Sequence, residues 1–235
     1  ALYGGHDAKV CALGERALVH WMCARPGEAI ADIRAALDWA QTLNHVGSRA
    51  HAMDYALVLH RFRSDPRAVA ACAEELIDFA SEQRLRDHRG KGASYRGWAR
   101  AILDDLVDGL NEMRAGLAAF EGVGTPEDLT VYYEMVAEVC LRAQRYDEGL
   151  RSLEDAFSQA ERHGILFWNA ELHRRRGELL LASGAPADAV HACFHDALDC
   201  ARRQGALALE LREAIGCARW HGTTSDGISG AAILR

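Results

Sequence analysis

A pattern of small and apolar residues recurs five times along the chain, and it constrains the fold more than any other feature. Each copy begins with a small or β-branched residue, followed by an apolar residue four positions later and by a small and then a large apolar residue at positions seven and eight. The starting residues are Ala29, Val69, Gly109, Gly149 and Val190, so successive copies lie 40, 40, 40 and 41 residues apart. A fixed period of this length is typical of stacked helical hairpins.

The stretch 168–201 shows what one copy contains. Its first half places Leu172, Leu179 and Leu180 at helical spacing. Gly184 then ends this helix, because glycine adopts the left-handed conformation at little cost. Pro186 suits the first turn of the next helix, where a missing N–H is tolerated. A lone hairpin of this kind cannot bury both apolar faces, so the copies must stack on one another.

The same signals predict the remaining helices. The expected ranges are 8–23, 28–43, 48–62, 67–82, 95–106, 110–120, 127–143 and 147–162, with a last helix at 207–220 that caps the stack. Residues 85–94 are polar and contain two glycines, so we expect a long loop there. The sequence therefore predicts an all-α fold, a right-handed α-solenoid of about five tetratricopeptide-like hairpins over residues 1–221, followed by a flexible tail at 222–235.

Composition excludes several classes of partner and location. The formal net charge of -7 argues against general affinity for nucleic acid or for an anionic membrane surface. The seven cysteines form no CxxC pair, as expected of reduced thiols in a cytoplasmic protein. No apolar run reaches the roughly 18 residues that a membrane span needs. The chain starts without methionine, so we expect it to be a part of a longer polypeptide.

Several segments resemble one known family. They are YGGHDAKVCALGERALVHW and ALDWAQTLNH in the first hairpin, and AELHRRRGELLLA with HACFHDALDCARRQGALALELR near the end. They are similar to the C-terminal helical-repeat region of large bacterial signalling proteins that carry a class III adenylate/guanylate cyclase domain or a DNA-binding domain, then an AAA-type ATPase. The likeness covers most of residues 2–220. It implies a regulatory or interaction module whose catalytic domains lie upstream.

The chain itself shows no catalytic constellation. It contains no GxxxxGK phosphate-binding loop and no paired-aspartate metal site. We therefore expect no enzymatic activity, no cofactor and no bound metal. The leading hypothesis is a non-catalytic domain that binds a protein or peptide, or its own upstream cyclase or ATPase domains. The alternative is a small-molecule sensor domain of a signalling ATPase or a transcriptional regulator.

A candidate binding face follows from the helical phase, because the first helix of each hairpin lines the concave side of such a superhelix. The residues expected on it are Asp54, Arg61, Trp98, Glu134, Glu138, Arg142, Arg174 and Glu178. This face would hold a peptide through charge-assisted hydrogen bonds, with Trp98 as an apolar anchor. Alternatively, Glu138 with Arg142 and Arg174 with Glu178 are ordinary intrahelical pairs, which stabilise a helix by about 0.2–0.5 kcal/mol each.

Two further clusters have competing interpretations. His191 and His195 lie four apart on one helix, a spacing that suits two metal ligands, but no third ligand is evident and hydrogen-bonded histidines are the simpler interpretation. A basic cluster comprises Arg84, Arg86, His88, Arg89, Lys91 and Arg96. It would suit a phosphate or acidic partner, whereas the acidic protein as a whole favours a solvated loop.

Overall fold

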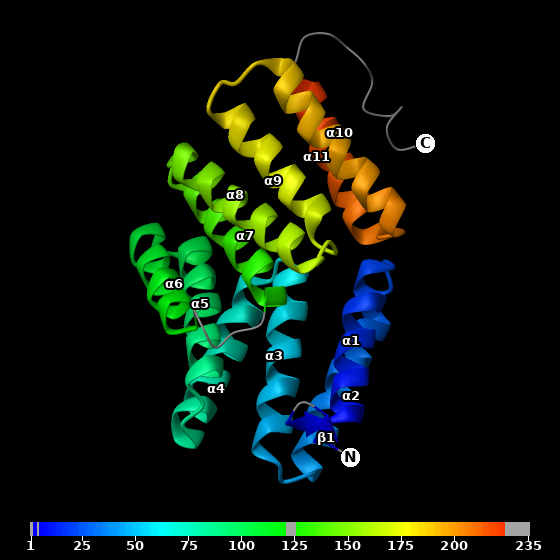
Figure 1. Cartoon of the computed structure of the whole chain (residues 1–235), viewed down its shortest axis with the longest axis vertical. Helices are drawn as coiled ribbons and strands as arrows, with labels where there is room; N and C mark the ends of the chain where they lie inside the picture. The colour runs from blue at the N-terminus through cyan, green and yellow to red at the C-terminus, as the bar shows by residue number, and fades with distance from the viewer. Residues whose placement is uncertain (1, 4, 121–125, 224–235) are drawn as a thin grey trace. The chain divides into compact units, whose positions relative to one another are not determined.

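The computed structural model describes residues 2–3, 5–120 and 126–223, and within them it contains eleven α-helices and one short β-hairpin (Figure 1). The helices are α1 Ala8–Met22, α2 Pro26–Thr42, α3 Val46–Phe62, α4 Pro66–Gln83, α5 Arg86–Leu103, α6 Leu106–Phe120, α7 Pro126–Arg142, α8 Tyr146–His163, α9 Asn169–Ala182, α10 Ala187–Gln204 and α11 Leu207–Thr223. The predicted all-α helical-repeat fold is confirmed.

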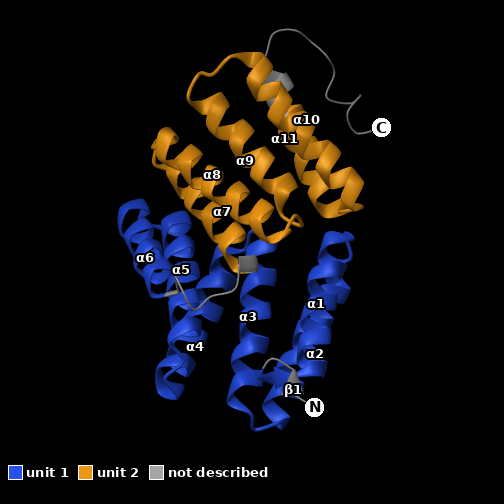
Figure 2. Ribbon diagram, viewed as in Figure 1, with its two compact units in different colours: residues 1–124 blue, residues 125–235 orange. Residues whose placement is uncertain are grey.

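The chain divides into two compact units, Ala1–Gly124 and Thr125–Arg235 (Figure 2). In unit 1, α1 packs on α2, α3 on α4 and α5 on α6, so this unit holds three hairpins. In unit 2, α7 packs on α8 and α9 on α10, and α11 packs on both α9 and α10. Helices adjacent in sequence are thus adjacent within each unit, as a repeat pattern with short connections predicts.

The residues that define the repeat pattern form the interior of the hairpins. The starting residue of every copy is buried, and so are the apolar residue four positions later and the small residue at position seven. In the first copy these are Ala29, Ile33 and Ala36, which are at most 4% exposed. The repeated residues therefore lie where the helices pack on one another, and small residues recur there because they allow two helices to approach closely.

The β-hairpin precedes the first helix and was not expected from the sequence. Strands β1 Leu2–Tyr3 and β2 His6–Asp7 pair antiparallel, with Tyr3 opposite His6. Asp7 then caps α1, because its side chain accepts hydrogen bonds from the backbone N–H groups of Lys9 and Val10. The hairpin thus leads directly into the first repeat.

The expected loop at 85–94 is wrong, because α5 begins at Arg86 and the region is helical. The reason is that glycines of α5 pack against neighbouring helices, Gly92 against Ala73 and Ile77 of α4, and Gly90 and Gly97 against α6. A Cβ atom on Gly97 would lie 2.7 Å from the carbonyl oxygen of Gly109, and one on Gly116 would lie 2.7 Å from that of Gly90. These four glycines form a glycine seam where the backbones of α5 and α6 touch, and this packing outweighs the low helix propensity of glycine.

Two boundaries lie at the limit of the described residues. Helix α11 continues to Thr223, beyond the predicted end at 220. The expected connector at 121–125 and all but the first two residues of the expected tail at 222–235 lie outside the described residues. Within the described residues, none of the helices is both long enough and apolar enough to cross a membrane.

Candidate functional site

The structure places the three unit 1 candidates, Asp54, Arg61 and Trp98, differently from the expectation. Arg61 and Trp98 are each 1% exposed, and the Arg61 guanidinium carbon lies 4.5 Å from the centre of the Trp98 ring. Their side chains therefore form an interior cation–π contact. This corrects the placement of Trp98 as an anchor on an accessible face, since a ligand cannot reach the ring without displacing the surrounding helices.

Asp54 lies beside the expected basic cluster and neutralises part of it. Its carboxylate is 3.3 Å from Nε2 of His88 and 3.9 Å from Nζ of Lys91, whose side chain is largely buried. Arg96 lies on α5 with His88 and Lys91, and its Nε atom donates a 2.6 Å hydrogen bond to Glu112 of α6. The cluster is thus distributed along α5 and partly paired with acids, which weakens its case as a phosphate site.

Unit 2 contains a denser arrangement of charges, centred on one face of α9. Glu171, Arg174, Arg175 and Glu178 follow one another at helical spacing on that face. Glu134 and Glu138 approach from α7, and Arg212 and Glu213 from α11, both of which pack on α9. We call these eight residues the Glu–Arg cluster.

Arg175 joins α9 to α7. Its Nη2 atom lies 2.9 Å from a carboxylate oxygen of Glu134 and 3.4 Å from one of Glu138. Its Nη1 atom donates a 2.7 Å hydrogen bond to Glu178. Glu134 is fully buried, so the expectation that it offers its charge to a partner is corrected: this charge is compensated internally by Arg175.

Arg174 joins α9 to α11. It donates hydrogen bonds to Glu171 and Glu178 and lies 3.7 Å from an oxygen of Glu213. Arg212 adds a second cation, with Nη1 at 3.1 Å from Glu171. Arg174 is 8% exposed, so this candidate too belongs to the buried part of the cluster.

In unit 2, three of the predicted residues remain at least partly accessible. The exposed fractions of the Glu138, Glu178 and Arg142 side chains are 14%, 28% and 49%. Arg142 lies 4.0 Å from Glu138, the intrahelical pair considered as the alternative. We call these three residues the open edge. Whether the eight sequence candidates bind a partner stays a prediction.

The pKa values of two buried carboxyl groups, those of Glu171 and Glu213, are shifted in opposite directions. Burial alone would raise the pKa of Glu171, but the positive charges of Arg174 and Arg212 outweigh it and hold that pKa well below its usual range. Burial, together with the negative charge of Glu171, raises the pKa of Glu213 well above its ordinary value. Within the described residues neither oxygen of Glu213 accepts a hydrogen bond, so no hydrogen bond to the charged form offsets this rise in pKa.

Glu213→Gln is expected to stabilise the protein at neutral pH and to have little effect at acidic pH. Above an ordinary pKa of 4.5 the unfolded chain releases the Glu213 proton while the folded chain keeps it, so stability falls as pH rises through this window. The neutral amide removes that loss. Urea unfolding of both proteins across this range measures the effect, with the exposed Glu154→Gln as the charge-matched control. A difference that does not grow with pH would contradict it.

The cluster is suited to binding charged groups. It contains five carboxyl groups and three guanidinium groups; because the pKa of Glu213 is raised, the four other carboxylates carry the negative charge and exceed the three guanidinium groups by one. Buried ion pairs contribute little net stability compared with apolar packing of the same volume, so such a cluster needs another explanation, of which partner recognition is one.

Sequence reasoning missed four members of the Glu–Arg cluster: Glu171, Arg175, Arg212 and Glu213. The helical spacing of Glu171 and Arg175 relative to Arg174 was a signal for the first two, but nothing in the sequence pairs α9 with α7 or α11.

His191 and His195 are both exposed, with ring centroids 6.2 Å apart. In the described part of the chain, no group of three or more potential metal ligands includes them.

Comparisons with known proteins support the fold. No protein-family model matches the chain. The chain is 31% identical over 210 residues to an uncharacterised protein of Rhizobium meliloti strain 1021, a match that covers 89% of this chain and 20% of that protein. It thus spans about a fifth of that relative's length. Its structure is similar to that of Bacillus thuringiensis PlcR, crystallised with the peptide PapR7 and DNA, with a TM-score of 0.71, 14% identity and coverage of 87% of this chain and 74% of that one.

Proposed function

We propose that this chain is a non-catalytic regulatory domain that binds a basic segment of a protein or peptide along the open edge of unit 2. The observation that carries the proposal is the excess of carboxyl groups over guanidinium groups in the Glu–Arg cluster. Glu138 and Glu178 are the partly exposed members of that excess. A partner's arginine or lysine would donate charge-assisted hydrogen bonds to them, and Arg142 would orient a neighbouring carboxylate.

Two findings support this class of function. PlcR, which resembles the chain in fold, was crystallised with a bound peptide. The Rhizobium relative is about five times longer than the matched region, which fits a module serving other domains of one polypeptide. The basic segment would then belong either to upstream cyclase or ATPase domains of a signalling protein or to a separate partner. The PlcR complex also contains DNA, but the net charge of -7 disfavours that ligand here.

Panning a random peptide library against the protein tests the proposal. Enriched peptides are expected to carry arginine or lysine. The double variant Glu138→Gln/Glu178→Gln is expected to weaken their binding by about 30-fold to 150-fold, because at each site a hydrogen bond to a charged group, worth about 1.5–3 kcal/mol, becomes a neutral one worth about 0.5–1.5 kcal/mol. Each glutamine keeps a side-chain oxygen, and circular dichroism checks that the helices persist.

Arg176→Gln is the matched control, since Arg176 lies on α9 but is exposed and outside the cluster. It is expected to leave peptide affinity unchanged. Acidic or purely apolar enriched peptides, or equal affinity in the double variant, would contradict the proposal. A thermal shift with a metabolite panel instead of peptides would favour the alternative, a small-molecule sensor, and binding of duplex DNA would favour nucleic-acid recognition.

A further inference from the structure

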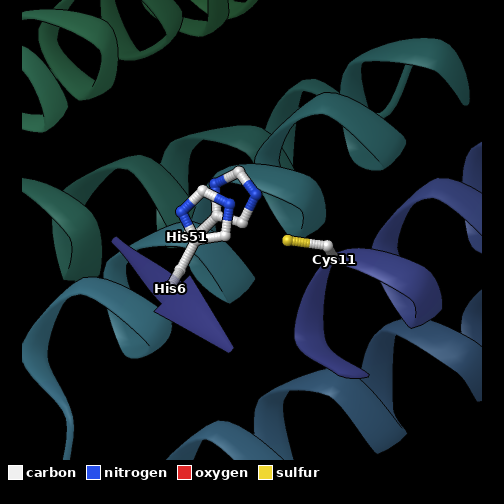
Figure 3. A group of neighbouring side chains, drawn as sticks. All are labelled: His6, Cys11 and His51. Atoms are coloured by element: carbon white, nitrogen blue, oxygen red, sulfur yellow. The ribbon is translucent and has the colours of Figure 1, made fainter. Parts of the chain in front are cut away.

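We propose that His6, Cys11 and His51 of unit 1 bind one zinc ion. Their ligand atoms all lie within 4.8 Å of one another, and this is the one such group of three or more His, Cys, Asp and Glu side chains within the described residues. In Figure 3 the two imidazole rings lie side by side, and the Cys11 sulfur points toward them. The residues come from β2, α1 and α3, so sequence spacing alone gives no metal motif.

One hydrogen bond explains how three separate elements converge. The backbone N–H of Asp7 donates to Oγ of Ser48 at 2.9 Å, which fixes the end of β2 against the first turn of α3. Cys11 lies one helical turn beyond Asp7 on α1, and His51 lies one turn beyond Ser48 on α3. His6 directly precedes Asp7. The contact between Asp7 and Ser48 therefore brings all three side chains to one place.

Further contacts hold the hairpin in this position. The indole N–H of Trp39 donates a 3.0 Å hydrogen bond to Asp7. Gly47 lies so close to the hairpin that a Cβ atom on it would be 2.6 Å from the carbonyl oxygen of Gly5. The His6 and His51 rings are stacked, with centroids 3.8 Å apart and an interplanar angle of 21°. The fold therefore gathers the three side chains, but the in-plane lone pairs of two nearly parallel rings do not meet at one point, so one imidazole must rotate to direct its nitrogen at the ion.

The chemistry of this set matches zinc. One thiolate and two imidazoles are ligands that zinc prefers, with Zn–N distances of about 2.0–2.1 Å and Zn–S of about 2.3 Å. Tetrahedral coordination at those lengths places ligand atoms about 3.3–3.6 Å apart, so the ligand atoms must approach one another by about 1 Å as one imidazole leaves the stacked arrangement. All three side chains are half-buried, so an ion can enter from solvent. Binding releases the Cys11 thiol proton, and a water fills the fourth position.

Cobalt(II) provides a spectroscopic test on the intact protein after treatment with a chelator. One equivalent is expected to give a thiolate-to-cobalt charge-transfer band and the visible absorption of a tetrahedral site, and zinc is expected to displace it. Cys11→Ser is expected to abolish the charge-transfer band. It should also weaken zinc binding by more than about 100-fold, because loss of even an outer-shell partner costs about 10–100-fold. His51→Gln is expected to weaken zinc binding similarly.

Cys23→Ser is the matched control, since Cys23 is the exposed cysteine that ends the same helix. It is expected to leave both the spectrum and the zinc affinity unchanged. Circular dichroism of the metal-free variants confirms that they fold. The proposal is overturned if cobalt gives no charge-transfer band, or if Cys11→Ser and His51→Gln bind zinc as the parent protein does. Failure here leaves the peptide proposal untouched, because that site lies in unit 2.

Discussion

Arg174→Met is expected to lower the free energy of unfolding by about 3–5 kcal/mol, because it leaves buried carboxylates without their central cation. Arg174 binds Glu171 and Glu178 and is 8% exposed. Methionine keeps most of the side-chain length, so the decrease in the free energy of unfolding results more from the lost charge than from lost side-chain volume. Arg212 still pairs with Glu171, which keeps the effect within this range. Urea unfolding followed by circular dichroism measures it.

A control and a double variant isolate the electrostatic origin of this loss. Arg176→Met makes the same change on the exposed face of α9 and is expected to shift stability by no more than about 0.5 kcal/mol. Adding Glu171→Gln to Arg174→Met should recover part of the loss, because it removes a stranded charge. Equal effects of Arg174→Met and Arg176→Met would show that the cluster carries no buried electrostatic coupling.

Trp98→Ala is expected to cost about 3–5 kcal/mol, as truncation of a large buried aromatic does. Its ring is 1% exposed and carries the Arg61 guanidinium on its face, so the alanine variant leaves both a cavity and an uncovered buried cation. Val107→Ala is the control within unit 1, because Val107 is 70% exposed; its expected effect is about 0.5 kcal/mol or less.

The Trp98 experiment also distinguishes the sequence interpretation from the structural one. A ring on an accessible binding face would contribute little to folding and much to peptide affinity. The interior ring observed here predicts the reverse. A loss of stability below about 1 kcal/mol, combined with weaker peptide binding, would therefore restore the original interpretation of Trp98.

Helix positions were predictable wherever burial follows from the local pattern. The repeat around Val69 is an example, since its apolar spacing predicts a helix at 67–82 and α4 is Pro66–Gln83. Prediction failed at 86–94, where the glycines read as loop residues. Gly90 lies against Gly116 of α6 and Gly92 against Ile77 of α4, and single-sequence propensity contains no information on these contacts.

The candidate site was only partly predictable for the same reason. The phase of α9 singled out Arg174 and Glu178, and both belong to the Glu–Arg cluster. Glu213, which Arg174 approaches, was not singled out, because it lies on α11, and α11 is paired with α9 only in three dimensions. His6, Cys11 and His51 converge through one tertiary hydrogen bond, which no spacing rule anticipates. Helical periodicity thus predicts which residues share one face of a helix, but not which residues of other helices contact that face.

The glycine seam between α5 and α6 has a consequence for how this sequence can drift in evolution. Main-chain atoms, rather than side-chain volumes, set the separation of these two helices at Gly97 and Gly109. Substitutions on the outer faces of the hairpin can therefore accumulate without changing its width. Gly97, Gly109 and Gly116, by contrast, tolerate no side chain without moving a backbone, because a Cβ atom on each would lie 2.6–2.7 Å from main-chain atoms of the facing helix. The spacing of this hairpin is thus fixed by its glycines, whatever side chains its outer faces carry.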